Sequence, residues 1–116
     1  MHYLATLVGR EDAPGARPGT PEFEAEVVEY AAFEEREAAA VAGGAALFPS
    51  ADALHIRRSA GQTLLTDGPY AEFAQVVDGL YLFTARDRAE AAEIASAIPL
   101  GDRGRTEVRQ VVDLGD

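Results

Sequence analysis

The sequence predicts an α+β fold in which two helices cover one face of a mainly antiparallel sheet. Two segments have the apolar periodicity of amphipathic helices, and short apolar or alternating segments typical of strands surround them. The order is strand, helix, strand pair, strand, helix, strand, which is close to the ferredoxin-like pattern. A chain of 116 residues can bury one core, so we expect a single domain over residues 1–116.

The first half of the chain contains a strand and the longer helix. Residues 3–8 are mostly apolar and are expected to form the first strand. Thr20 and Pro21 suit the N-cap and the first helical position, and the helix is expected to run from Glu22 to Val41. Gly43-Gly44 is expected to end it, because glycine readily adopts the left-handed conformation of a helix C-terminus. The predicted apolar stripe of this helix consists of Phe23, Val27, Tyr30, Ala31, Ala38 and Val41.

Three strands are expected next. Residues 53–58 and 63–66 are separated by a short connection and are expected to pair as a hairpin. Residues 79–84 follow as a strand that is apolar on both faces, with leucines on one side and aromatic residues on the other. We therefore expect an exposed aromatic sheet face, which usually marks an interface, and a homodimer packed sheet to sheet.

The second helix and the last strand complete the fold. Asp87 with Glu90 three residues later is typical of a capping box at a helix start. Pro99 is expected to stop the helix, and residues 106–112 alternate as a final strand. The predicted apolar stripe of this helix consists of Ala91, Ile94, Ala95 and Ile98.

The composition excludes several classes of partner. The net charge is −10, and the basic residues are ten scattered arginines without a lysine, so we expect no nucleic-acid partner. No run approaches the roughly 20 apolar residues that span a bilayer, so we expect no membrane partner. The absence of cysteine and of a basic leader is compatible with a cytoplasmic location, which we expect.

The most informative segment is Thr66–Glu72, with the sequence Thr-Asp-Gly-Pro-Tyr-Ala-Glu. Pro69 has no backbone N–H and cannot continue a central strand, and Gly68 tolerates turn conformations. The strand is therefore expected to end abruptly and to present the carboxylate of Asp67 at its tip. Asp67 could act as a general base, or it could only tie the turn through backbone N–H groups. The residues leave both alternatives open.

Other candidate site residues come from the helix and the strands. Glu34 is expected near the apolar stripe, where it could face a pocket beside Tyr30 or reach water at a tilted helix end. Tyr70 could line the same pocket, although aromatic packing in the core is the simpler explanation. His55 points away from its apolar neighbours and is either a pocket residue or a surface residue. No spacing of metal ligands and no nucleotide-binding glycine motif occurs, so we expect no metal and no cofactor.

The chain resembles the YCII-related, or DGPF-domain, family. The specific part of the resemblance is Asp-Gly-Pro-aromatic-Ala-Glu in Thr66–Glu72, and Gly79–Leu82 and Thr106–Arg109 support it. The resemblance implies a ferredoxin-like dimer with a cleft between helix and sheet. Some relatives carry a His–Asp pair proposed as catalytic, with the histidine in the first helix. The aspartate corresponds to Asp67, but the predicted first helix, residues 22–41, contains no histidine. Many relatives are neighbours of extracytoplasmic-function sigma factors.

Two classes of function follow from these observations. The first is a dimeric small-molecule-binding or accessory module, tied to sigma-factor regulation by the resemblance. The alternative is a cofactor-free lyase or isomerase in which Asp67 acts as general base on a small aromatic or carbonyl substrate. Tyr30 or Tyr70 would then orient a ring or a carbonyl oxygen.

Overall fold

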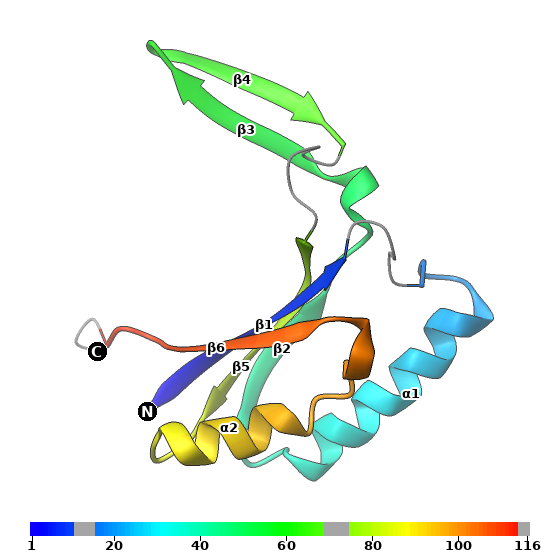
Figure 1. Cartoon of the computed structure of the whole chain (residues 1–116), viewed down its shortest axis with the longest axis vertical. Coiled ribbons are helices and arrows are strands. Elements are labelled where there is room, and N and C mark those ends of the chain that lie inside the picture. The colour runs from blue at the N-terminus through cyan, green and yellow to red at the C-terminus, as the bar shows by residue number, and fades with distance from the viewer. Residues whose placement is uncertain (11–15, 69–74, 114–116) are drawn as a thin grey trace.

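The computed structural model describes residues 1–10, 16–68 and 75–113. These residues form an antiparallel four-stranded sheet in the order β2-β5-β1-β6 and a separate two-stranded hairpin, β3-β4. Both helices lie on the same face of the four-stranded sheet (Figure 1), which confirms the predicted α+β fold. The elements are β1 (His2–Arg10), α1 (Pro21–Arg36), β2 (Val41–Ala46), β3 (Leu54–Ser59), β4 (Gln62–Asp67), β5 (Gln75–Thr84), α2 (Arg88–Ser96) and β6 (Arg105–Gln110), with short 3₁₀ turns at Ser50–Asp52 and Gly101–Arg103.

β1 lies in the middle of the sheet. It pairs with β5 on one side, where His2 is opposite Thr84, and with β6 on the other, where Tyr3 is opposite Gln110. The register with β5 shifts between Leu7 and Val8. The predicted first strand is therefore confirmed and is one of the two inner strands of the sheet.

The predicted end of the first helix is wrong. α1 ends at Arg36, and the segment Val41–Ala46 is β2, an edge strand paired antiparallel with β5. Alanine and glycine carry little strand propensity, so the long-range pairing with β5 overrides the local preference. Gly44 lies opposite Tyr81, and a Cβ atom at residue 44 would approach the tyrosine ring to 2.6 Å. Gly44 thus makes room for a core aromatic residue, and Gly43-Gly44 lies in a strand and does not end a helix.

The core lies between the helices and one face of the sheet. Phe33 is the buried residue of α1, although the predicted stripe omitted it. In the predicted stripe of the second helix, Ala91, Ile94 and Ala95 are buried on α2, and Ile98 is buried two residues after its end. The core consists of Tyr3, Ala5, Leu7, Phe33, Tyr81, Phe83, Ala85, Ala91, Ile94, Ala95, Ile98 and Leu100.

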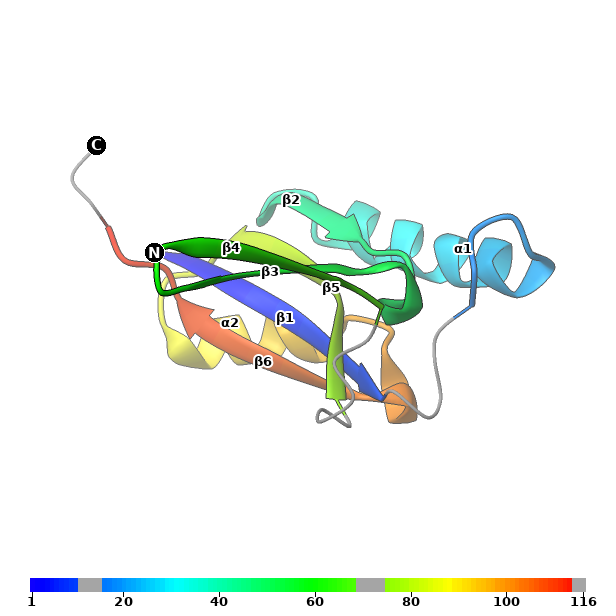
Figure 2. The same cartoon turned by 90° about the horizontal axis from the view of Figure 1, so that it is seen from above.

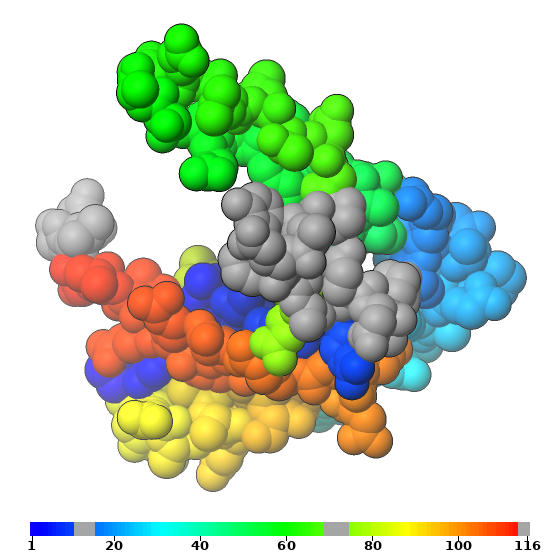
Figure 3. All heavy atoms as spheres, turned by 45° about the horizontal axis from the view of Figure 1, so that its top comes forward, coloured from blue at the N-terminus to red at the C-terminus, as the bar shows by residue number. Residues whose placement is uncertain are grey.

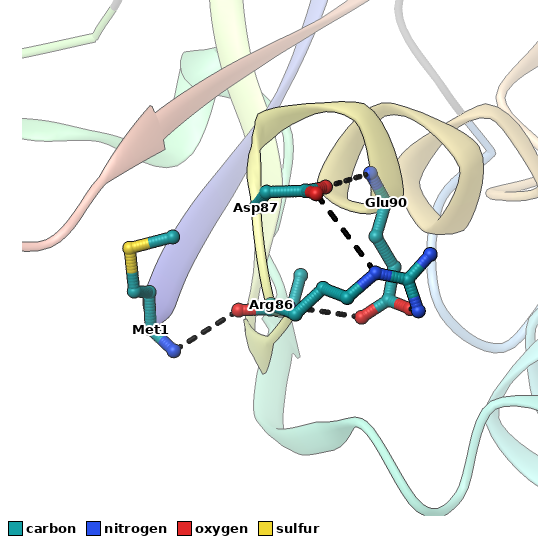
Figure 4. A network of polar contacts seen from close by, with 5 residues as sticks. Met1, Arg86, Asp87 and Glu90 are labelled. Carbon is teal, nitrogen blue, oxygen red and sulfur yellow. Dashed lines mark hydrogen bonds and ion pairs between the residues drawn. The ribbon is translucent and has the colours of Figure 1, made fainter.

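Both predicted helix N-termini are confirmed. At α1, the Thr20 hydroxyl accepts a hydrogen bond from the Phe23 N–H at 3.2 Å. At α2, Asp87 accepts from the Glu90 N–H at 2.9 Å, and the Glu90 carboxylate accepts from the Arg86 N–H at 2.9 Å (Figure 4). This reciprocal pair resembles a capping box, except that Glu90 accepts from the N–H of Arg86, the residue before the N-cap Asp87. Within the described residues, no helix combines the length and the apolar character needed to cross a bilayer.

The expectation of an exposed aromatic sheet face is wrong. The aromatic side of β5, with Tyr81 and Phe83, is buried beneath the helices because these large rings fill the core. The opposite face of the sheet carries aliphatic residues that are partly exposed, namely Leu4, Leu80 and Leu82. The face without helices is therefore apolar but not aromatic.

The β3-β4 hairpin projects from the rest of the molecule as an arm (Figures 1 and 3). Its turn residues Ala60 and Gly61 both have positive φ, 50° and 79°, as a type I′ hairpin turn requires. Its apolar side chains are exposed, and the radius of gyration of 16.0 Å exceeds the roughly 13 Å expected for this length. The exposed set consists of Leu54, Ile56, Leu64 and Leu65.

Candidate functional site

A large cleft separates α1 from the sheet. Its volume is about 950 Å³. Phe33 is the one residue of α1 that is buried. The N-terminal part of α1 extends past the end of the sheet (Figures 1 and 2). The walls come from α1, the β2 region, the facing ends of β1 and β5, and the turn before β6. The lining residues that matter below are Leu7, Phe23, Glu26, Glu34, Tyr30, Tyr81 and Arg103.

Two tyrosines and a glutamate form the polar centre of this cleft. The Tyr81 hydroxyl donates a hydrogen bond of 2.9 Å to Oε1 of Glu34, which joins β5 to α1. The rings of Tyr30 and Tyr81 stack with centroids 6.4 Å apart, and the Phe33 ring lies 5.2 Å from that of Tyr81. Burial, and to a smaller extent the hydrogen bond to Glu34, raises the pKa of Tyr81 far above its ordinary value of 10.0. Tyr81 is therefore a stable hydrogen-bond donor at neutral pH.

An arginine closes one end of the cleft. Nη1 of Arg103 donates to Oε1 of Glu26 on α1 at 2.9 Å, and Nε donates to the Leu100 carbonyl at 3.0 Å. Nη2 also donates to the Pro99 carbonyl, so all three nitrogens of the guanidinium group are engaged. The pair with Glu26 links α1 to the turn before β6.

The hydroxyl of Tyr30 lies near this end. Burial raises the pKa of Tyr30 above 10.0; Arg103 lowers it, whereas Glu26, Glu29 and Asp78 raise it. Tyr30 is thus also protonated at neutral pH. An apolar cavity with a few convergent polar groups is the usual form of a small-molecule site, and here Glu34 supplies a carboxylate beside two neutral phenols.

The structure brings together some of the predicted site residues and separates others. Tyr30 and Glu34 line the cleft, and Glu34 is held by Tyr81 although much of its side chain is exposed. Asp67 is the last residue of β4, as predicted, but it is exposed and lines neither this cleft nor a second hollow of about 430 Å³. His55 lines that second hollow. Tyr70 lies outside the described residues.

Sequence reasoning missed the contacts that shape the cleft. The Tyr81–Glu34 bond and the Arg103–Glu26 pair join residues 47 and 77 positions apart. No local pattern indicates such pairs. Within the described ranges, no group of three histidine, aspartate or glutamate side chains is placed to hold a metal ion.

Fold and site together define a small α+β protein with a ligand-sized cleft between a helix and an antiparallel sheet. The family model of the YCII-related domain matches residues 1–115. The chain therefore belongs to the YCII-related family, and the resemblance drawn from the Asp-Gly-Pro motif is confirmed. Among curated proteins, none matches the chain.

Proposed function

We propose that this YCII-related protein is a ferredoxin-like homodimer that binds a small molecule in the cleft between α1 and the sheet. The observation that carries the proposal is the cleft itself. Its volume of about 950 Å³ falls within the range of roughly 300–1,000 Å³ for small-molecule sites. A binding module of this kind fits the regulatory association that the family resemblance implies.

The shape and chemistry of the walls support a binding role. α1 has 16 residues but buries only Phe33, so its other side chains do not close the space beneath it. Phe23 and Leu7 supply apolar surface, while Tyr30 and Glu34 supply polar groups on one side. Apolar walls provide affinity, and the few polar groups orient the ligand.

The β3-β4 hairpin supports the homodimer. A lone two-stranded hairpin is only marginally stable in water. This one exposes large apolar side chains, with Ile56 at 64% and Leu65 at 63% exposure. The sheet face without helices also leaves Leu80 and Leu82 partly exposed. A second copy that covers the arm and this face would bury both apolar surfaces.

The alternative function, a lyase or isomerase with Asp67 as general base, stays a prediction. Asp67 lies on the exposed arm and does not share a cavity with Tyr30 or Glu34. The geometry therefore favours the binding module.

A screen of small aromatic compounds by ligand-observed NMR tests the proposed site. Val27→Trp would place a bulky indole ring in the cleft, because Val27 lines it. Val28→Trp is the matched control, since Val28 is 69% exposed and lies outside the cleft lining. We expect ligands to bind the unaltered protein and Val28→Trp but not Val27→Trp. Equal binding to all three proteins, or no ligand at all, would contradict the proposed site.

The dimer is tested separately by light scattering at tens of micromolar protein. We expect a mass of twice 12.3 kDa. A monomeric mass would contradict the homodimer and leave the cleft to be judged by the NMR screen.

A further inference from the structure

Charge in the cleft is distributed unevenly. The described lining contains five carboxylates and three arginines. Arg103 is taken by Glu26 and two carbonyl oxygens, and Arg17 forms an ion pair of 3.0 Å with Asp52, which lies outside this lining. Arg10 has its own interactions and is not free. The guanidinium groups are thus already engaged within the protein.

The carboxylate of Glu34, unlike these arginines, forms no ion pair within the described residues. Its Oε1 accepts the hydrogen bond from Tyr81, but a phenol donates without neutralising the carboxylate. Within the part of the chain that the structure describes, no arginine or histidine forms an ion pair with Glu34. The cleft therefore holds a negative charge without a cation from the described residues.

The partly exposed Tyr30 ring beside Glu34 adds a second preference for positive charge. Tyr30 and Tyr81 are stacked and both line the cleft. The face of an aromatic ring attracts ammonium groups, and this attraction adds to that of a nearby carboxylate. The raised pKa values of both tyrosines keep the phenols neutral, which preserves them as donors near the carboxylate.

We propose that the cleft selects small organic cations, namely protonated amines that carry an aromatic or aliphatic body. The ammonium group would lie beside Glu34 and against the ring of Tyr30, which is partly exposed, whereas the ring of Tyr81 is buried. The apolar body would occupy the space bounded by Phe23 and Leu7. This inference rests on the proposed function, because it names the ligand class of the same cleft. The net charge of −10 adds a long-range attraction for such cations.

Three probes with the same phenylethyl body but different charge test the inference. They are 2-phenylethylamine, 2-phenylethanol and 3-phenylpropionate, titrated by NMR at pH 7 and low salt. We expect the amine to bind about tenfold more tightly than the alcohol, which corresponds to about 1.4 kcal/mol. The carboxylate should bind more weakly than the alcohol, because it meets Glu34 with like charge.

Two substitutions on α1 locate the effect. Glu34→Gln removes the charge but retains an acceptor for the Tyr81 hydroxyl, so the amine should lose about tenfold in affinity and the alcohol should be unchanged. Glu35→Gln is the matched control, because it removes the same charge from an exposed neighbour that does not line the cleft. Its effect on the amine should be under twofold, because Glu35 does not line the cleft and its charge is screened from a ligand bound there.

The outcomes separate this inference from the proposed function. Tighter binding of the carboxylate or the alcohol than of the amine would overturn the cation selectivity but retain the ligand site. An equal loss of amine affinity in Glu34→Gln and Glu35→Gln would also overturn it, because the attraction would then be general. If none of the three probes binds, and the aromatic screen finds no ligand, both proposals fail.

Discussion

The attachment of α1 depends on one buried side chain, so Phe33→Ala should have a large effect on stability. Phe33 is 1% exposed, and its ring packs against Tyr81 with centroids 5.2 Å apart. Truncation of a fully buried phenylalanine destabilises proteins by about 3–5 kcal/mol, through lost burial and the cavity that remains. Single domains are stable by only about 5–15 kcal/mol, so this loss is a substantial part of the total.

The free energy of unfolding can be measured by urea denaturation followed by circular dichroism. With a slope of about 1.5 kcal/mol/M, the expected loss would lower the urea midpoint by about 2–3 M. Val28→Ala is the matched control on the same helix, because Val28 is 69% exposed and alanine is the better helix former. Its midpoint should hardly change. A loss below about 1 kcal/mol for Phe33→Ala would refute the view that this residue anchors α1.

Three further predictions concern single contacts. Tyr81→Phe removes the hydrogen bond to Glu34 and should lower the free energy of unfolding by about 1 kcal/mol at pH 7. Because the pKa of Tyr81 is raised in the folded protein, the free energy of unfolding of the unaltered protein should fall as pH rises above about 10, and that of the variant should fall less steeply. Asp87→Ala removes the cap on Glu90 and should lower the thermal midpoint by about 4 °C, as a loss of about 1 kcal/mol implies; an unchanged midpoint would contradict this role. Ala60→Asn places a residue that tolerates positive φ in the hairpin turn, so the hairpin should be stabilised and amide exchange in β3 and β4 should slow by about fivefold. Unaltered exchange would show that Ala60 does not strain the turn.

Local sequence signals predicted most elements but not β2. Contacts between residues close in sequence determine both helix starts, at Thr20 and Asp87, and the hairpin around Ala60. Each of these features lies where the sequence indicated. The segment Val41–Ala46 is a strand only because β5 offers it a free edge. Such pairing leaves no periodic pattern in alanine and glycine, and the helix was therefore extended too far.

The candidate site was predictable to the extent that it depends on one helix. Tyr30 and Glu34 are one turn apart, so the helical period alone places them on adjacent parts of the same surface. Whether that surface meets a core or a cleft depends on how closely α1 approaches the sheet. The pair between Arg103 and Glu26 contributes to that spacing, and no sequence pattern near either residue indicates it.

The central position of β1 constrains the order in which the protein can fold. Among the described strands β1 comes first in the sequence, whereas its neighbours β5 and β6 come last. Tyr3 pairs with Phe83 and Gln110, so the middle of the sheet cannot close until the residues up to Gln110 are available. The β3-β4 hairpin needs only residues 54–67 and can form earlier. Long-range closure of this kind slows folding, and the apolar β1 segment must stay uncovered by its own partners during that time.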